Sequence, residues 1–334
     1  MGVIIKDIEY FLPENVETNI DLSVKNPSWD MGKVFSKTGV LQRHIAARDE
    51  TALNLGIKAC EKLFKKNDKN IFDTLIFCTQ TPDYIMPGNA YLIHKHFAFK
   101  EQTIVFDINQ ACSGYIYGLF LAKSLILSGA VKNVLLINAD TYSKYIHPGD
   151  RSTRALFGDG AAATHISADK TDNGIIDTLI SSSGNGYENF FIPSGGCKVP
   201  YNNTDIGSYT DENGNTRSDM NIHMNGMGVL SFFRQRVPAQ IKELLKQQMK
   251  SVEDVDAFIF HQASKVTLDY LSAALKIDAD KMYSNIHDVG NLVSASIPVA
   301  LKMAIHQGRI KAGDHIVISG FGVGLSWGSM LIKI

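Results

Sequence analysis

The two halves of the chain repeat one order of apolar runs and helical segments, and this repetition constrains the fold more than any other feature. Short runs rich in β-branched and aromatic residues alternate with helical periodicity, which is typical of an α/β fold with mainly buried strands. The repeated runs are residues 73–78, 103–107 and 134–138 in the first half and residues 256–261, 282–285 and 315–319 in the second. We therefore predict two duplicated α/β halves.

The segment before the last run of each half strengthens this interpretation. Residues 121–132 and residues 301–311 are both amphipathic, end near a glycine and carry a lysine before the next strand. Unrelated strand-helix-strand units share part of this periodicity, so chance similarity is the alternative. As duplicates, the halves comprise residues 1–172 and 173–334, and Cys112 of the first corresponds to Asn291 of the second.

Composition argues against several classes of protein. With 334 residues, 45% hydrophobic and 20% charged, the chain can bury a large core, and its net charge of −1 offers no general attraction to nucleic acid. The first residues lack the pattern of a signal peptide, and no apolar run reaches the ~18 residues that span a bilayer. Four widely spaced cysteines without a CxxC pair favour a reduced, cytoplasmic protein without a metal site.

Cys112 is the candidate nucleophile. It follows a predicted strand and directly precedes Ser113, Gly114 and a long apolar helix. A helix N-terminus stabilises negative charge, so we expect it to lower the pKa of the thiol towards the reactive thiolate. The alternative is a buried cysteine that acts as a small hydrophobic side chain.

His261 and Asn291 are the candidate partners of Cys112. His261 ends an apolar run, where active-site groups of open α/β sheets collect, and its neutral imidazole can polarise a carbonyl or exchange protons near pH 7. Asn291 supplies an uncharged amide donor. The alternatives are a structural histidine and an asparagine that caps a helix.

Three glycine-rich segments require separate interpretations. Residues 320–328 contain four glycines, which would let backbone N–H groups approach an oxyanion, although tight packing would produce the same pattern. Residues 157–163 lack the lysine and the spacing of a phosphate loop, so we interpret them as tight packing. Residues 194–225 form either a pocket wall or lid, or a tolerated surface insertion.

Taken together, these motifs resemble the β-ketoacyl-[acyl carrier protein] synthase III family of thiolase-fold condensing enzymes. The resemblance covers nearly the whole chain, from TGV at residues 38–40 and RHIA at 43–46 to SWG at 326–328. Its specific part is the order and spacing of ACSGY around Cys112, HQA at His261, GN at Asn291 and the final glycine-rich loop.

The resemblance implies a fold and a reaction. The fold would have five layers, α-β-α-β-α, with the nucleophile and dimer interface in the first half and the histidine and asparagine in the second. Cys112 would accept an acyl primer, while His261 and Asn291 would bind the thioester carbonyl of malonyl-acyl carrier protein as it loses carbon dioxide. Backbone N–H groups of Cys112 and Val323 would form the oxyanion hole. No metal or cofactor is implied, and Met86 would reach across a homodimer to the partner's acyl pocket.

The chain departs from the family pattern where coenzyme A binds. In the family, a tryptophan and arginines clamp the adenine of coenzyme A. Here Lys33 and Lys37 occupy the positions of the tryptophan and one arginine, and Trp29 is displaced by a few residues. Arg151, the other arginine of the clamp, is retained. The primer is therefore bound either to coenzyme A or to a carrier protein. Val323 replaces a usual glycine, which narrows its backbone freedom but keeps its N–H.

The basic residues that would receive an acidic carrier protein are Lys265, Arg234 and Arg236. The departures from the family pattern, taken together, suggest that the chain serves a specialised pathway. Solvated helix faces are often basic without a partner.

Three other functions compete with condensation in fatty-acid or specialised acyl synthesis. A thiolase-fold acyltransferase would pass the acyl group from Cys112 to a hydroxyl or amine, but it would prefer a carboxylate beside the histidine. A thiolase or hydroxymethylglutaryl synthase usually has a second cysteine or a glutamate as a base, and neither stands in the Asn291 or final-loop motifs. A scaffold subunit would usually have lost the cysteine.

Overall fold

Two β-sheets organise the chain in a computed structural model that describes residues 2–170, 173–201 and 207–334. The strand order is β1-β7-β6-β4-β5 in the first sheet and β13-β14-β15-β8 in the second. The first sheet consists of β1 (Gly2–Phe11), β4 (Thr74–Cys78), β5 (Ile104–Ile108), β6 (Asn133–Asp140) and β7 (Gly160–Asp169). The second consists of β8 (Gly174–Ser182), β13 (Ala257–Phe260), β14 (His315–Gly322) and β15 (Ser326–Lys333).

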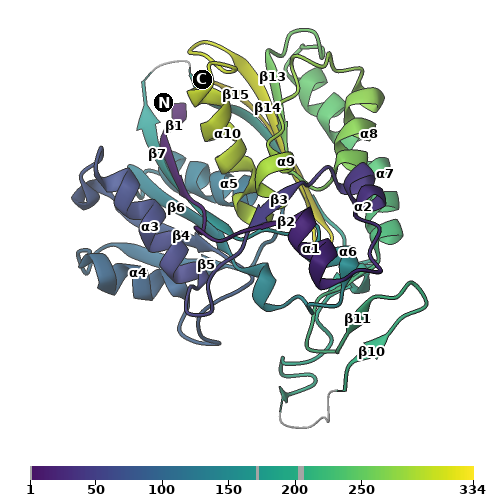
Figure 1. The fold of residues 1–334 in the computed structure, drawn as a ribbon. Helices are drawn as coiled ribbons and strands as arrows, with labels where there is room; N and C mark the ends of the chain where they lie inside the picture. The colour runs from purple at the N-terminus through teal and green to yellow at the C-terminus, as the bar shows by residue number, and fades with distance from the viewer. Residues whose placement is uncertain (1, 171–172, 202–206) are drawn as a thin grey trace.

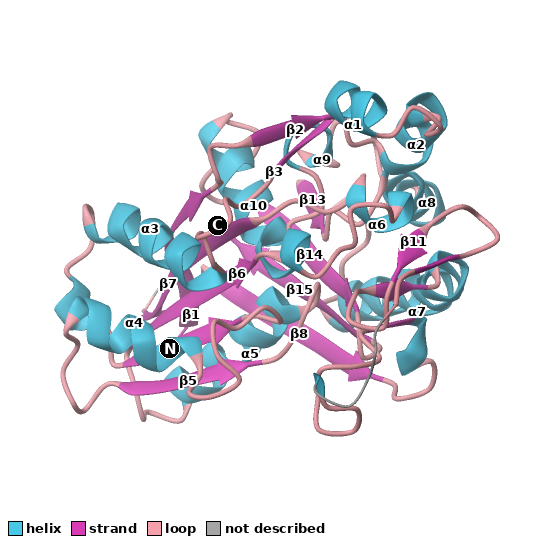
Figure 2. Cartoon of the chain, turned by 60° about the horizontal axis from the view of Figure 1, so that its bottom comes forward, coloured by secondary structure: helices cyan, strands magenta, loops and turns pink. Residues whose placement is uncertain are grey.

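Helices cover both sheets and fill the space between them. α5 (Gly114–Leu127) and α10 (Ser296–His306) contact strands of both sheets. α3 (Ala52–Phe64) and α4 (Asn89–Phe97) cover the first sheet, and α7 (Gly226–Gln247) with α8 (Lys265–Leu275) covers the second. Figures 1 and 2 both show these outer pairs on opposite sides of the molecule. The five predicted layers, α-β-α-β-α, are confirmed.

The sequence explains which helices lie inside. α5 has one charged residue, Lys123, among 14, so a central position between two sheets buries most of its surface. α3 instead buries a stripe that includes Leu55, Ala59 and Leu63 and turns its lysines outward, as expected of an outer layer. Both buried faces contribute to the hydrophobic clusters that hold the sheets together.

The smaller helices and strands lie outside the two main sheets. They are β2 (Val16–Thr18), β3 (Gln42–His44), β9 (Phe190–Phe191), β10 (Tyr209–Thr210), β11 (Thr216–Arg217), β12 (His223–Met224), α1 (Asn19–Lys25), α2 (Met31–Thr38), α6 (Arg151–Arg154) and α9 (Ile286–Val289). The predicted irregular segment at 194–225 contains the β10–β11 hairpin, which extends away from the layers in Figure 1. Residues 202–206 of that segment lie outside the described residues.

The two halves match strand by strand except at one edge. The order β1-β7-β6-β4 has its counterpart in β8-β15-β14-β13, but the predicted strand at 282–285 is wrong. It is reduced to one isolated bridge between Phe258 and Met282, because α9 begins at Ile286 and leaves no length for a ladder. The predicted boundary between residues 172 and 173 touches the undescribed segment 171–172 and stays a prediction.

Within the described ranges, no helix combines the length and the apolar character needed to cross a membrane.

Candidate active site

Cys112 lies in the turn that joins β5 to α5. The turn is closed by a hydrogen bond from the Gly114 N–H to the Ala111 carbonyl at 2.7 Å, and Ser113 forms the N-cap of α5. A bond of 2.7 Å between the hydroxyls of Ser113 and Ser326 ties this turn to the start of β15. The nucleophile of the first half is therefore anchored directly to the second half.

Glycines of β14 allow the second sheet to pass against Cys112. A Cβ on Gly320 would lie 2.7 Å from the Cys112 carbonyl oxygen, and a Cβ on Gly322 would lie 2.8 Å from its Cβ and 3.1 Å from its sulfur. Side chains at these two positions would displace Cys112, since real Cβ atoms do not approach so closely. The glycines of the final loop are thus required by this close approach.

The protonation of Cys112 differs from the sequence prediction. The side chain is buried, with 8% exposed, and burial together with the charge of Asp140 raises the pKa of the thiol instead of lowering it. Cys112 is therefore a thiol in the resting protein. Its activation requires a proton acceptor during attack.

His261 directly follows β13 and points into the same region. Its N–H donates to the Ser319 carbonyl of β14 at 2.8 Å, and its ring meets Phe321 edge-on at 5.7 Å. The side chain is 1% exposed, and this burial lowers the pKa of the imidazole to about 3. The ring is neutral near pH 7, and its Nδ1 has no hydrogen-bond partner in the described part of the chain.

Asn291 is held beside His261 by its own backbone. Its N–H donates to the Leu156 carbonyl and its carbonyl accepts from Gly158, both at 3.0 Å, which fixes the segment to the first half. The side-chain oxygen accepts from the Val293 N–H at 2.9 Å. This local bond resembles the predicted capping role, but it leaves the amide nitrogen free to face His261.

The two side chains converge on one point. Asn291 Nδ2 and His261 Nε2 are 3.3 Å apart. One neutral tautomer of the ring accepts this hydrogen bond, whereas the other carries its proton on Nε2, so both nitrogens can donate to a single carbonyl oxygen between them. The pair is suited to hold a developing oxyanion without a charged residue.

Two backbone N–H groups complete the predicted site. Among the described residues, neither the N–H of Cys112 nor that of Val323 donates to a backbone carbonyl, and the Cys112 N–H faces its own sulfur. Gly322, next to Val323, is the residue that contacts Cys112. These donors are therefore available to an oxygen bound near the sulfur, as an oxyanion hole requires.

The three predicted substrate residues lie apart from this centre. Lys37 is exposed in the last turn of α2, and Met86 is 79% exposed in the loop between β4 and α4. Arg151, at the start of α6, donates through its guanidinium to the Asn213 carbonyl at 3.2 Å, beside the β10–β11 hairpin. Trp29 is buried against Leu22 and Ala155, so it cannot replace the missing aromatic partner of an adenine clamp.

Sequence reasoning missed Asp140, at the end of β6. Its fully buried carboxylate accepts from the Gln80 N–H at 2.8 Å, the Ser294 hydroxyl at 2.5 Å and the Ser294 N–H at 3.3 Å. Burial raises its pKa to about 7. Asp140 thus links both halves beneath the site. Its position after a buried strand, like that of His261, was the available signal.

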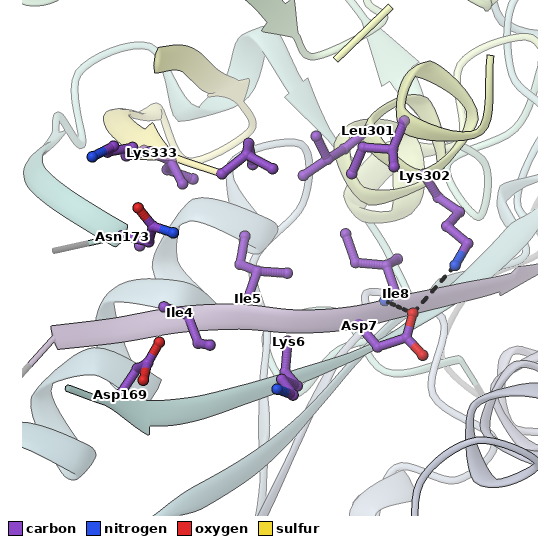
Figure 3. A pocket seen from close by; sticks show the side chains of 14 residues that line it. Ile4, Ile5, Lys6, Asp7, Ile8, Asp169, Asn173, Leu301, Lys302 and Lys333 are labelled. Carbon is purple, nitrogen blue, oxygen red and sulfur yellow. Dashed lines mark hydrogen bonds and ion pairs between the residues drawn. The ribbon is translucent and has the colours of Figure 1, made fainter. Parts of the chain in front are cut away.

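Among the cavities of the described structure, two differ in their relation to Cys112. One of about 300 Å³ lies between β1, α10 and the end of β15, where Figure 3 shows Ile5, Ile8 and Leu301 facing the space and Lys302 bound to Asp7. Its lining contains no cysteine, serine or histidine. The other, about 130 Å³, includes Val323 and therefore adjoins the Cys112 site.

Comparison with known proteins finds relatives over almost the whole chain. Sequence profiles of 3-oxoacyl-[acyl-carrier-protein] synthase III match residues 106–184, and the profile of its C-terminal region matches residues 245–334. The chain is 35% identical to the β-ketoacyl-[acyl-carrier-protein] synthase III of Fusobacterium nucleatum over 98% of both chains. It is 37% identical to that of Campylobacter concisus, covering 98% of this chain and 95% of the relative.

Solved structures agree with the sequence relatives. A crystal structure of a 3-oxoacyl-(acyl-carrier-protein) synthase III superposes with a TM-score of 0.97 and 37% identity over 100% of both chains. The Pseudomonas aeruginosa enzyme superposes with a TM-score of 0.87 and 29% identity, covering 100% of this chain and 98% of that one. The chain belongs to the β-ketoacyl-[acyl-carrier-protein] synthase III family of condensing acyltransferases.

Proposed function

We propose that the chain joins an acyl primer carried on Cys112 to malonyl-acyl carrier protein, with loss of carbon dioxide, to form a 3-oxoacyl-acyl carrier protein. The observation that carries this proposal is the pair of nitrogens, His261 Nε2 and Asn291 Nδ2, 3.3 Å apart. The pair lies beside the strand whose Gly322 contacts Cys112.

The first step loads the primer. The Cys112 sulfur attacks the thioester carbon of the donor, the bond from that carbon to the donor sulfur breaks, and the thiol proton passes to the leaving thiolate. The N–H groups of Cys112 and Val323 stabilise the tetrahedral oxyanion. Because burial raises the pKa of the Cys112 thiol, attack and proton loss are coupled rather than sequential.

The second step forms the new carbon–carbon bond. His261 and Asn291 donate to the malonyl thioester oxygen while the bond to the carboxylate breaks, carbon dioxide leaves and the electron pair forms an enolate. The enolate carbon attacks the acyl carbon on Cys112, the bond from that carbon to the Cys112 sulfur breaks, and the departing thiolate takes a proton from solvent to restore the thiol. Neutral donors suit this step, because a desolvated, uncharged site favours release of the carboxylate as carbon dioxide.

The surroundings of His261 favour condensation over transfer to a hydroxyl or amine. A general base for such an acceptor would be oriented by a carboxylate on Nδ1. In the described part of the chain Nδ1 has no partner, and the neighbour on Nε2 is the Asn291 amide. The lowered pKa of the imidazole also makes it a weak base.

The carrier protein docks, in this proposal, on the face shared by α2, α7 and α8. α2 and α8 touch there, since a Cβ on Gly39 would lie 2.9 Å from the Cβ of Lys265. Lys265 is ion-paired with Asp269 at 2.5 Å, and the Arg234 guanidinium lies 4.7 Å from the centre of the Tyr270 ring. Arg236 is also exposed on α7 but lies on a different side of the helix from Arg234, so the cations that an acidic carrier protein would meet on this face are Lys265 and Arg234.

A homodimer is also part of the proposal. The edge strand β5 exposes Ile104, with 46% of its surface free, and the loop before α4 exposes Ile85 and Met86 at 93% and 79%. Monomers rarely leave such residues uncovered together. A second copy pairing along β5 would cover them and bring Met86 towards the partner's pocket.

Intact-protein mass spectrometry tests the function directly. The protein is mixed with acyl-coenzyme A and acyl-carrier-protein donors and then with malonyl-acyl carrier protein. We expect an acyl adduct on Cys112 that disappears with release of carbon dioxide, and the accepted donor would identify the carrier of the primer. An adduct that clears only with an alcohol or amine would replace condensation by simple acyl transfer, and no adduct from any donor would support a scaffold.

A further inference from the structure

The buried carboxylate of Asp140 contacts the loop that carries Asn291, and that loop contains a strained residue, Val293. We propose that Asp140 is a positioning residue for the carbonyl-binding pair formed by His261 and Asn291. It acts through Ser294, which keeps Val293 in a left-handed backbone conformation, and Val293 in turn orients the Asn291 amide. This inference rests on the proposed function, since it concerns a donor that would bind the malonyl thioester.

Val293 has a backbone conformation that valine rarely adopts. Its φ is 54°, in the left-handed region, where a branched side chain crowds the backbone. The residue is fully buried and belongs to the hydrophobic cluster that includes Cys112. A residue keeps such a conformation only when its surroundings over-determine it, and strain of this kind gathers at functional sites. The contacts on either side of Val293 should therefore hold it in place.

Ser294, the residue after Val293, is fixed to Asp140 by two hydrogen bonds. Its hydroxyl donates to the carboxylate at 2.5 Å, and its backbone N–H donates at 3.3 Å. Asp140 is itself rigid, because it ends β6, an inner strand of the first sheet, and accepts from the Gln80 N–H at 2.8 Å. The Gln80 side chain accepts in turn from the Tyr142 hydroxyl. The first half of the chain thus holds the loop just beyond Val293.

The strained residue also makes the contact that orients Asn291. The Val293 N–H donates to the side-chain oxygen of Asn291 at 2.9 Å, which leaves the amide nitrogen 3.3 Å from His261 Nε2. The Ser296 hydroxyl is more distant from the same oxygen, at 3.5 Å. Because φ is the rotation about the bond between nitrogen and Cα, relaxation of Val293 would turn its N–H relative to the segment that Asp140 holds. The Asn291 amide would then lose its main anchor.

The effect of this positioning should be confined to the second step of the reaction. His261 and Asn291 must donate to one oxygen together, and a displacement of about 1 Å in such a pair can lower a rate by about 10²-fold. Loading of the primer uses other donors in the proposed function, the N–H groups of Cys112 and Val323. Loss of the link to Asp140 should therefore slow condensation without a matching effect on acylation.

The test measures both steps on one sample of Ser294→Ala. Acylation of Cys112 is followed by intact mass, which also shows that the protein is folded, and condensed product is followed after addition of malonyl-acyl carrier protein. We expect condensation to fall by about tenfold to 10²-fold while acylation changes by less than about threefold, since the displaced amide acts only in the second step. An unchanged ratio of the two rates, or an equal loss in both, would overturn the proposal.

Asp140→Asn is the second variant and should lower the same ratio. An amide has one acceptor oxygen, so it cannot accept from both the Gln80 N–H and the Ser294 N–H as the carboxylate does. A ratio that falls in Ser294→Ala but stays at the wild-type value in Asp140→Asn would exclude Asp140 as the anchor.

Ser329→Ala is the matched control. It removes another buried serine hydroxyl, which lies 3.0 Å from the Gln240 side-chain oxygen and 2.9 Å from the Ser319 hydroxyl in the second sheet. This variant should lose stability as a buried polar substitution does, yet keep the wild-type ratio of condensation to acylation. A fall in its ratio as large as that of Ser294→Ala would show a general packing effect and refute positioning.

A double variant tests the strained residue itself. Glycine adopts the left-handed conformation without strain, so Val293→Gly should make the hold on Ser294 unnecessary. In that background, adding Ser294→Ala should lower the ratio of condensation to acylation by less than about threefold. Equal losses from Ser294→Ala with valine and with glycine at position 293 would exclude Val293 as the link.

Crystal structures separate this inference from the function it rests on. In Ser294→Ala, the φ of Val293 should leave the left-handed region, and the distance from Asn291 Nδ2 to His261 Nε2 should grow by about 1 Å or more. An unchanged loop would overturn the proposal whether or not the protein condenses. Wild-type protein that accepts a primer but forms no condensed product would refute the proposed function, and the structures alone would then decide whether Asp140 holds Asn291.

Discussion

The two halves of the molecule share a strand order but differ at their edges and in the chemistry they contribute. The first half has the additional strand β5, an exposed apolar edge and Cys112 directly after that strand. The second half has only a bridge at the corresponding position and contributes His261 and Asn291. The difference indicates that the nucleophile lies next to the edge where we propose a dimer, whereas His261 and Asn291 are held by loops packed inside one chain.

The largest expected effects come from variants that remove either the nucleophile of the first half or one member of the carbonyl-binding pair of the second half. Cys112→Ala should abolish acylation and lower condensation by on the order of 10⁴-fold or more, because a covalent nucleophile has no substitute. Asn291→Ala should keep acylation near the wild-type rate but lower condensation by about 10²-fold, the usual loss when one oxyanion donor is removed. Intact mass and product formation measure the two steps separately.

Equal losses of acylation in both variants would contradict this division between the halves. His261→Ala serves as the companion variant, because it removes the second nitrogen of the same converging pair and should resemble Asn291→Ala.

The next effect concerns the contact between the halves. Gly322→Ala would place a methyl group 2.8 Å from the Cys112 Cβ, so we expect acylation to fall by about 10²-fold and thermal stability to decrease. Gly184→Ala is a matched control, since nothing lies within 4 Å of a Cβ built there. Acylation rates and melting curves of both variants check the prediction, which fails if the two behave alike.

A pH effect should follow from Asp140, which joins the halves. Burial raises its pKa from 3.8 to about 7, so the folded state holds a proton that the unfolded state releases. Its contribution to the free energy of unfolding is complete below pH 4 and falls by up to about 4 kcal/mol as the pH rises to 7. Urea unfolding at a series of pH values should show this slope in wild-type protein and lose it in Asp140→Asn. If the free energy of unfolding depended on pH in the same way in both proteins, a group other than Asp140 would cause the slope.

The smallest effect is expected at the edge that only the first half has. Ile104→Lys adds a charge to the exposed edge of β5, and we expect the dimer to weaken by about tenfold, since charges on an edge strand oppose pairing. Sedimentation over a range of concentrations measures the equilibrium. Val24→Lys, on the exposed face of α1, is the control and should leave it unchanged. A monomeric wild-type protein would contradict the proposed dimer.

Sequence alone predicted those parts of the fold and of the site that short motifs and the local pattern of apolar residues determine. Cys112, His261 and Asn291 each stand in a short motif next to a strand or helix, so the sequence could nominate them, and their catalytic roles stay a prediction. The repetition of strands and helices predicted two duplicated halves, and the family resemblance implied their five layers. The fate of residues 282–285 could not be predicted, because the strand pattern there competes with the start of α9 four residues later.

The rest of the site depends on contacts between distant segments. Gln80 and Tyr142 are 62 positions apart, and Asp140 and Ser294 are 154 apart, so no local pattern announces either bond. The pKa of Cys112 was misjudged for the same reason. The helix N-terminus is visible in the sequence, whereas the burial that opposes it comes from β14 of the other half.

The position of Cys112 at the contact between the halves also makes it a native reporter of their docking. Because the thiol is only 8% exposed, a reagent should label it slowly in the absence of substrate, and movement of the β14 glycines away from it should speed the labelling. Exposed Cys197 offers an internal reference within the same chain. A change in the ratio of the two labelling rates would then report a change in the contact between the halves at Cys112, and binding of carrier protein or primer should lower the ratio.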